Sequence, residues 1–340
     1  MQIRIDKSYD TEGWVGKEKM NNPPNWYGVS PEVIARRGKQ WHQDPNDGPW
    51  LDREGAEAAI QLKLDKDIIT EDEADLLLQW TRNGYFIIKD AIPEEDFGLL
   101  DGFVHDLDDL WTTDKVLEGL QVMSLHVDGR KPGPVDHSEL LSWPIEKRLE
   151  LRDTQIWRVH YYHPHSQSAM KLAKVKRLLR MTELLLEENP VLINSIGFKY
   201  GSQVTLHQDL GSYHIHPANR LVGVWVACED VNPEAGPLSV YPGTHRVPNW
   251  PGWHNYPQTN IRSCHLHTRD EQAKYLSEAV KGQTLKPLVI KKGDVIFQHG
   301  LQIHCGNKVT DRKATRYSMV IHYSTKGADR MHEVEGPFNW

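Results

Sequence analysis

Apolar positions follow a helical period in the first half of the chain and a strand-like period after Pro190. Residues 171–188 carry apolar side chains on or near one helical face, which predicts an amphipathic helix. Beyond Pro190, short β-branched and aromatic runs are separated by Gly, Pro and Asn turns, a pattern typical of strands. The strands are predicted at 191–199, 221–231, 238–241, 285–290, 295–297 and 316–323, and a helical pattern interrupts them only at 270–280.

An earlier helix is predicted from its start and stop signals. Thr70 and Glu73 have the spacing of a capping box, in which a side chain at each position satisfies a backbone amide of the other. An Asn-Gly pair at 83–84 ends that helix. The run at 85–88 then predicts a strand, and a second helix is expected over 93–110.

Helices followed by many strands, without helices alternating between them, predict a mainly β antiparallel fold with flanking helices. A barrel-like or jelly-roll sandwich fits this order of elements. The region 67–340 is therefore expected to form one domain.

Residues 1–66 are polar but rich in tryptophan, so we expect an extension that packs against this domain. A cover over the active site is the alternative interpretation. Short helices are predicted within it at 31–37 and 54–64. The tryptophans are Trp14, Trp26, Trp41 and Trp50.

Composition excludes several classes of protein. The chain has 340 residues and a net charge of −7, which argues against nucleic acid as the main partner, because phosphate binding needs clustered Lys and Arg. Three scattered cysteines predict reduced thiols and a cytoplasmic location. No apolar run approaches the roughly 20 residues that a membrane helix needs, and the first residues lack an apolar signal core.

The candidate chemistry lies at His207 and Asp209, two residues apart on a segment predicted to be extended. Side chains at this spacing on a strand point to the same side. With His304 they would form a set of two imidazoles and one carboxylate, which favours non-haem Fe(II). A hairpin-like pair of strands is expected to bring Arg316 beside His304, where its guanidinium could bind a carboxylate.

The stretch from His207 to Arg316 resembles the phytanoyl-CoA dioxygenase family of Fe(II)/2-oxoglutarate oxygenases, and the likeness extends over about 70–325. It implies a double-stranded β-helix core of the jelly-roll, cupin-like type. The residues that carry it are His207–Gln208–Asp209, Trp225, Glu234–Ala235–Gly236–Pro237–Leu238, Tyr241–Pro242–Gly243–Thr244–His245–Arg246, Gly293–Asp294–Val295–Ile296–Phe297, His304–Cys305–Gly306–Asn307 and Arg316.

The resemblance also implies roles for single residues. His207, Asp209 and His304 would ligate Fe(II), and Arg316 would bind the distal carboxylate of 2-oxoglutarate. Trp225 matches a position that lines the cosubstrate pocket, and Ser318 stands where the wider superfamily has an Arg-x-Ser pair.

The implied reaction consumes O₂ and 2-oxoglutarate, releases succinate and CO₂, and hydroxylates a C–H bond of a small molecule. Related halogenases replace the carboxylate ligand with a small residue, so the retained Asp209 argues for hydroxylation. The chain departs from the family at 305–306, where Cys-Gly replaces the frequent Gly-Ser after the second histidine. A second donor to 2-oxoglutarate is therefore not expected at that position.

Alternatives remain open for function and substrate. We expect a small polar or amphipathic metabolite, with an acyl-CoA as the second choice because Lys171, Lys174, Lys176 and Arg177 could bind its phosphates. A non-catalytic metal- or 2-oxoglutarate-binding module and a zinc hydrolase are the other candidate classes. The sequence predicts neither the substrate's identity nor the oligomeric state. His299 is left out of the ligand set, because five residues along a strand place it on the face opposite His304.

Overall fold

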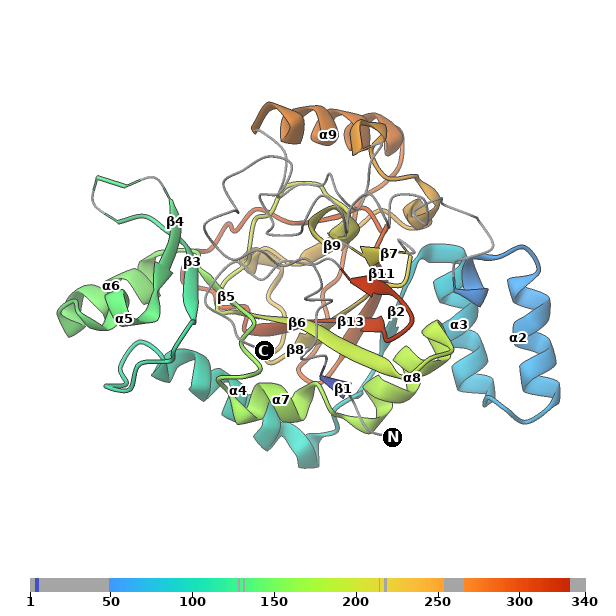
Figure 1. Cartoon of the computed structure of the whole chain (residues 1–340), viewed down its shortest axis with the longest axis horizontal. Coiled ribbons are helices and arrows are strands. Elements are labelled where there is room, and N and C mark those ends of the chain that lie inside the picture. The colour runs from blue at the N-terminus through green and yellow to red at the C-terminus, as the bar shows by residue number, and fades with distance from the viewer. Residues whose placement is uncertain are drawn as a thin grey trace, which may run out of the picture.

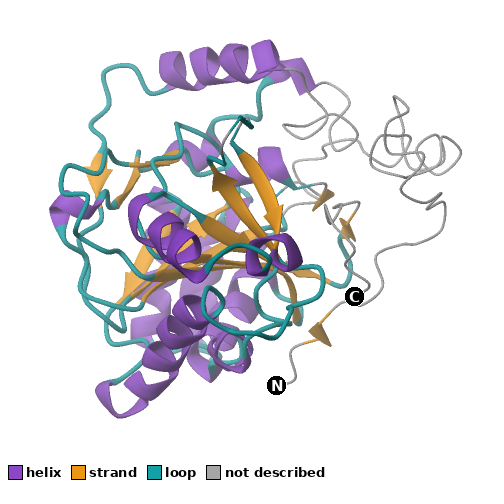
Figure 2. Cartoon of the chain, turned by 90° about the vertical axis from the view of Figure 1, so that its left-hand side faces the viewer, coloured by secondary structure: helices purple, strands orange, loops and turns teal. Residues whose placement is uncertain are grey.

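The computed structural model describes residues 4–5, 49–127, 129–130, 132–213, 215–216, 219–253 and 266–330. Trp14, Trp26, Trp41 and the helix predicted at 31–37 lie outside these ranges. In the described part, strands occupy the centre of the molecule and helices surround them (Figure 1; Figure 2). This arrangement confirms the predicted mainly β fold with flanking helices.

The strands form two main sheets. The major, nine-stranded sheet has the order β2-β11-β8-β13-β6-β5-β3-β4, and β1 pairs with β6 in parallel beside this path. Its strands are β1 (Arg4–Ile5), β2 (Tyr85–Ile88), β3 (Gln121–Leu125), β4 (Gly133–Asp136), β5 (Arg158–His160), β6 (Pro190–Phe198), β8 (Val222–Ala227), β11 (Val295–His299) and β13 (Ser318–Thr325). The minor sheet has the order β10-β9-β12, with β9 (Leu238–Val240), β10 (Lys286–Pro287) and β12 (His304–Gly306). A separate pair joins β7 (Ile215–His216) to β14 (Asp329–Arg330).

The helices cover the outer side of the major sheet and its ends. Figure 1 shows α4, α7 and α8 below the sheet, α2 and α3 at one end, and α5 and α6 beside β3 and β4. Helix α9 lies on the far side, above the minor sheet (Figure 1). The helices are α2 (Ala56–Asp65), α3 (Glu71–Asn83), α4 (Phe97–Asp109), α5 (His137–Leu141), α6 (Ile145–Thr154), α7 (Gln167–Leu172), α8 (Lys176–Leu186) and α9 (Leu266–Ala279).

Alternation along the strands creates two cores. On β13, Met319, Ile321 and Tyr323 face the helices and belong to the large cluster beneath the sheet. On the other face of the major sheet, Trp225 and Ile296 pack with apolar residues of β9, including Leu238 and Val240. Because these contacts join the two sheets, the sheets face each other, as a jelly roll requires.

The predicted capping box is present at α3. The Thr70 hydroxyl accepts a hydrogen bond from the Glu73 amide at 3.2 Å, and the Thr70 amide donates to the Glu73 carboxylate at 3.0 Å. Gly84 ends the helix in a left-handed conformation, with φ of 77°. The chain then enters β2 directly, as predicted.

The prediction of one continuous helix over 171–188 is wrong, because two helices, α7 and α8, occupy this stretch. The chain turns between them with Val175 in an extended conformation. The carbonyl of Ala173 accepts a hydrogen bond from the Tyr323 hydroxyl at 2.7 Å. This tertiary contact replaces a helical hydrogen bond, which explains why the local apolar pattern failed to reveal the break.

The described end of the extension packs against the main body. Trp50, Leu51 and Ile60 belong to the same apolar cluster as the helices below the major sheet, and the Trp50 indole donates to the Leu184 carbonyl at 2.8 Å. The division at residues 66 and 67 stays a prediction. No helix among the described residues is long and apolar enough to cross a membrane.

Candidate metal and cosubstrate site

Two distant histidines are locked together by their backbones. His207 and His304 form an isolated antiparallel bridge, in which each amide donates to the other's carbonyl, at 3.0 and 3.1 Å. Their ring centroids are therefore only 4.1 Å apart. Asp209 opens a 3₁₀ turn immediately after this bridge. One ligand atom from each of the three side chains lies within 4.8 Å of the others, so the set could hold a metal ion.

The orientation of both imidazoles suits a metal. The Nδ1 atom of His207 lies 2.7 Å from the Thr205 carbonyl, and Nδ1 of His304 lies 2.9 Å from the Gln302 carbonyl. A carbonyl can only accept, so each Nδ1 carries the proton and each Nε2 lone pair faces the site. The Oδ1 atom of Asp209 lies 3.6 Å from both Nε2 atoms.

The protonation states also suit a metal, which needs neutral imidazoles and an ionised carboxylate. Burial, together with the neighbouring His207, lowers the pKa of His304 to about 4. Burial opposes the charge of Asp209, but the surrounding histidines outweigh it and hold the pKa of Asp209 well below its ordinary range.

Arg316 is a buried cation that forms no ion pair with a carboxylate among the described residues. Its side chain is 2% exposed, and burial lowers its pKa to about 10. One Nη atom donates to the Gly236 carbonyl at 2.8 Å, while Nε has no partner among the described residues. The guanidinium lies 5.5 Å from the Trp225 ring and 5.9 Å from the Phe198 ring. A buried guanidinium with a free donor fits the carboxylate of a bound ligand.

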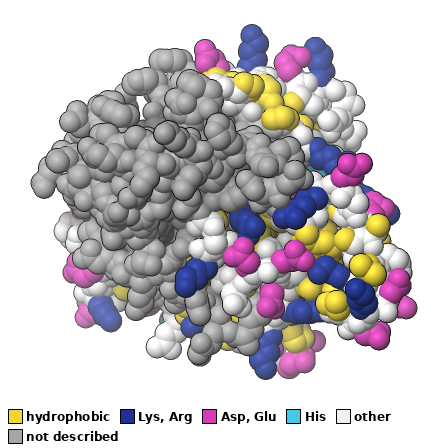
Figure 3. Space-filling model, turned by 45° about the vertical axis from the view of Figure 1, so that its right-hand side comes forward, with side chains coloured by type: hydrophobic (Ala, Val, Ile, Leu, Met, Phe, Trp, Pro, Cys, Tyr) yellow, Lys and Arg dark blue, Asp and Glu magenta, His cyan; other side chains and the backbone are white. Residues whose placement is uncertain are grey.

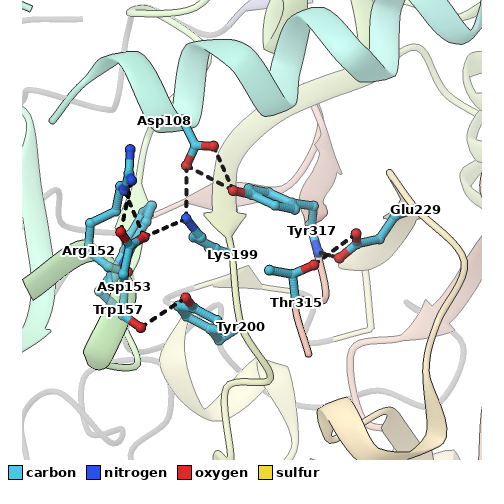
Figure 4. A network of polar contacts seen from close by, with 9 residues as sticks. All are labelled: Asp108, Arg152, Asp153, Trp157, Lys199, Tyr200, Glu229, Thr315 and Tyr317. Atoms are coloured by element: carbon cyan, nitrogen blue, oxygen red, sulfur yellow. Dashed lines mark hydrogen bonds and ion pairs between the residues drawn. The ribbon is translucent and has the colours of Figure 1, made fainter. Parts of the chain in front are cut away.

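The residues on both sides of Arg316 are held by acids (Figure 4). Glu229 accepts hydrogen bonds from the Thr315 hydroxyl at 2.9 Å and from the Tyr317 amide at 2.6 Å. The Tyr317 hydroxyl in turn donates to Asp108 at 2.7 Å. Glu229 is therefore occupied by the backbone that carries Arg316, which fixes the position of the guanidinium.

The expected route from His304 to Arg316 was wrong. β12 pairs with β9 in the minor sheet, whereas β13, which follows Arg316, pairs with β6 and β8 in the major sheet. No hairpin joins them among the described strands. The two side chains meet instead because the sheets face each other, and both line one cavity of about 400 Å³ that also contains His207 and Asp209.

The two remaining predicted residues lie on the inner face of the major sheet. Trp225, on β8, lines the cavity. Ser318 opens β13 two residues after Arg316, and alternation with Met319 places it on the inner face of the strand, although it does not line the cavity. It is fully buried, and its hydroxyl has no partner among the described residues.

His299 lies apart from the metal-binding set, as predicted, but not for the reason given, because it ends β11 in the major sheet whereas His304 opens β12 in the minor sheet. Its ring packs 5.4 Å from that of Trp80 on α3, and its Nε2 lies 3.1 Å from an Asp52 carboxylate oxygen. The preceding residue, Gln298, points inward and contacts Asp209.

The sequence did not predict how several cavity-lining residues contact the candidate site. Gln298, Tyr213, His322 and Arg158 line the cavity, and three of them contribute to the surroundings of Asp209. His322 could have been found, because it follows Arg316 by six positions on one strand and therefore shares its face. Arg158 lies on β5, a three-residue strand that carries no usable periodicity.

Comparison with known proteins agrees with this fold. The chain resembles the carbocyclase SnoK from nogalamycin biosynthesis, with a TM-score of 0.56 and 13% identity over 79% of this chain and 89% of that one. The epimerase SnoN from the same biosynthesis gives a TM-score of 0.51 and 15% identity, over 76% of this chain and 84% of that one. Both are described as non-haem, α-ketoglutarate-dependent enzymes.

Sequence comparison defines the relationship further. The chain is 32% identical to bovine peroxisomal phytanoyl-CoA dioxygenase over 142 residues, which cover 41% of this chain and 38% of the bovine protein. It is 22% identical to the human enzyme over 276 residues, covering 78% of this chain and 71% of that protein. The chain is 27% identical to the zebrafish phytanoyl-CoA dioxygenase domain-containing protein 1. The alignment covers 54% of this chain and 59% of the zebrafish protein.

Two kinds of relative therefore stand beside this chain: non-haem, α-ketoglutarate-dependent enzymes share its fold, and phytanoyl-CoA dioxygenases share its sequence. The chain spans less than two thirds of the length of the bovine and zebrafish relatives. The model of the phytanoyl-CoA dioxygenase family matches residues 80–314, and the chain belongs to that family.

Proposed function

We propose that this protein is an Fe(II)- and 2-oxoglutarate-dependent dioxygenase that hydroxylates an unactivated C–H bond of a small polar or amphipathic metabolite. His207, Asp209 and His304 would hold the iron, and Arg316 would bind the distal carboxylate of 2-oxoglutarate. One observation carries the proposal: the metal-binding set shares a cavity with a buried guanidinium that has no carboxylate partner among the described residues.

The bound iron and 2-oxoglutarate would supply the activation of O₂, with release of succinate and CO₂. The chain's own residues would bind the cosubstrate, orient it and exclude water. Arg316 provides a fixed positive charge, so that the keto acid enters in one orientation. Trp225 and Phe198 lie over the guanidinium and shield it from solvent. Ser318 adds a fully buried hydroxyl near Arg316, but it does not line the cavity, so its role toward the cosubstrate stays a prediction.

The cavity supports a small substrate. Its volume of about 400 Å³ must also contain the cosubstrate, so a whole CoA thioester would not fit inside. Its lining mixes polar Gln121, Arg158 and His160 with apolar Met123 and Ile196, which suits an amphipathic metabolite.

An acyl-CoA substrate stays the second candidate, because the bovine and human relatives are named phytanoyl-CoA dioxygenases. The basic cluster that might bind its phosphates does not line the cavity. Its residues are Lys171, Lys174, Lys176 and Arg177.

The test is anaerobic binding of 2-oxoglutarate to the Fe(II)-loaded protein, followed by succinate release when O₂ and a panel of carboxylate-bearing and neutral metabolites are added. We expect binding to be lost in Arg316→Met and retained in Arg177→Met, an exposed arginine of the basic cluster. Asp209→Ala should abolish hydroxylation. Absence of both 2-oxoglutarate binding and succinate from the loaded wild type would refute the proposal, whereas tight binding without turnover would favour the non-catalytic module.

A further inference from the structure

The two oxygens of Asp209 have different surroundings. Oδ1 faces the Nε2 atoms of His207 and His304, where a metal would bind. Oδ2 instead accepts a hydrogen bond from the Gln298 amide nitrogen at 2.8 Å and lies 3.3 Å from Nε2 of His322. The carboxylate is thus held on one side by protein donors and open on the other.

The contact from His322 is the end of a buried chain of hydrogen bonds. Its Nδ1 lies 2.8 Å from the Tyr213 hydroxyl, and that hydroxyl lies 2.8 Å from the Asn194 amide nitrogen. Asn194 is fully buried on β6, while Tyr213 and His322 are 3% and 2% exposed. The two histidines and the aspartate complete a metal-binding set without Asn194, Tyr213 and His322. The hydrogen-bonded arrangement of these three residues therefore points to another role.

The directions at both ends of this chain are set by groups that have a single role. The backbone amide of Tyr161 can only donate, and it donates to Oδ1 of Asn194 at 3.2 Å, so Asn194 presents its NH₂ to the Tyr213 oxygen. At the other end, the Asp209 carboxylate can only accept, so Nε2 of His322 carries the proton that faces Oδ2. With that proton on Nε2, Nδ1 accepts from the Tyr213 hydroxyl, which favours this tautomer.

We propose that Asn194, Tyr213 and His322 are positioning residues that hold Oδ2 of Asp209 and make it a one-oxygen ligand. The inference rests on the proposed iron site. With Oδ2 engaged by two N–H donors, Oδ1 would be the oxygen offered to the metal. A position that a two-oxygen carboxylate would take would then be left for the cosubstrates. Hydrogen-bonding partners of metal ligands typically contribute about 10- to 100-fold in metal affinity.

The test uses Co(II) as a spectroscopic probe, because its visible absorption reports coordination number. Tyr213→Phe removes one hydroxyl and leaves the direction of the His322 proton unspecified. We expect Co(II) affinity to fall about tenfold and the absorption bands to change as the carboxylate turns. Tyr323→Phe is the matched control, since it removes a buried hydroxyl from the opposite, helix-facing side of β13. It should leave the affinity and the spectrum as in the wild type.

A second pair of variants separates positioning from folding. His322→Leu removes the donor and should weaken Co(II) binding by about 10- to 100-fold, whereas His322→Gln retains an N–H donor and should restore most of the loss. Folded variants with wild-type affinity and spectrum would overturn this inference while leaving the iron site intact. A wild-type protein that binds no Co(II) would instead refute the proposed function, and this inference with it.

Discussion

The inward-facing side chains of Gln298 and Asp209 have room because residue 223 is glycine and has no Cβ atom. Gly223 lies on β8 between Gln298 and His322, with which it is paired in the sheet. A Cβ atom there would lie 2.9 Å from Cγ of Gln298 and 3.3 Å from Oδ2 of Asp209. The bond from Gln298 to Asp209 therefore requires glycine at this position.

Gly223→Ala should accordingly displace Gln298 and weaken metal binding by about tenfold, with a loss of stability of about 1–3 kcal/mol from overpacking. Metal titration and urea unfolding measure the two effects. Gly98→Ala, on α4, is the control, because a Cβ there meets nothing within 4 Å. It should be neutral or slightly stabilising, and equal effects of the two substitutions would contradict the prediction.

Buried histidines outside the site predict acid sensitivity. Burial lowers the pKa of His163 to about 3, whereas an unfolded histidine titrates near 6.5. Between these values the unfolded chain binds the extra proton, so the stabilising contribution is complete above about pH 6.5 and is lost as the pH falls. The loss amounts to at most about 1.4 kcal/mol per pH unit.

His163→Gln should therefore make the free energy of unfolding less dependent on pH between about pH 6 and 4.5. Urea denaturation at several pH values measures the slope. An exposed histidine offers the comparison, since His105→Gln should leave the slope unchanged. A variant at His163 with the wild-type slope would show that another group dominates the acid response.

At the scale of elements, the contribution of the α3 N-cap to the stability of the protein can be measured. Thr70→Ala removes one of the two reciprocal hydrogen bonds and should cost about 1 kcal/mol of stability. Thr113→Ala, in the loop after α4, removes only one local hydrogen bond, from the Lys115 amide, and should cost less. Both variants should bind metal as the wild type does, because α3 lies outside the cavity; a weakened metal site in Thr70→Ala would show that the helix end influences it.

Elements with strong local signals were predicted well, and those fixed by tertiary contacts were not. The capping box, β2, β6, β8 and β13 follow from residue patterns that reach over several positions. β5 and β12 have three residues each, too few for a period, and β4 contains Pro134, which usually argues against a strand. The break between α7 and α8 depends on Tyr323, far along the chain.

The same limit applies to the candidate site. Its ligand set was predicted from a family resemblance and from alternation at His207 and Asp209. The opposing sheets that bring Arg316 to the cavity could not be deduced, because a local pattern says nothing about which strands pair. The contact of Tyr213 with His322 could not be predicted for the same reason, since it joins residues from distant segments.

At the scale of the whole molecule, the charged surface and the cavity point to different partners. Figure 3 shows Lys and Arg side chains interspersed with Asp and Glu on the described part of one face. The absence of a nucleic-acid partner stays a prediction. The cavity, in contrast, concentrates positive charge at Arg158 and Arg316. A small anion such as 2-oxoglutarate should therefore stabilise the protein, whereas a polyanion should not. The cytoplasmic location stays a prediction.

Loading with a metal and 2-oxoglutarate should raise the unfolding temperature, with a gain of roughly 2.7 kcal/mol at a concentration about 100-fold above Kd. Mn(II) avoids turnover in this thermal measurement. In Arg316→Met, Mn(II) should still raise the unfolding temperature, whereas 2-oxoglutarate should give no further rise. Equal increments from 2-oxoglutarate in the variant and the wild type would remove Arg316 as its anchor.

The backbone bridge between His207 and His304 has a consequence for how the protein is made. During synthesis, the first histidine and Asp209 leave the ribosome long before the second histidine exists, and the bridge cannot close without it. A nascent chain, or one terminated before residue 304, would offer an ion only two of the three donors of this set. Iron capture would then be a late event in biogenesis, and a bound ion would mark a polypeptide whose two sheets have already come together.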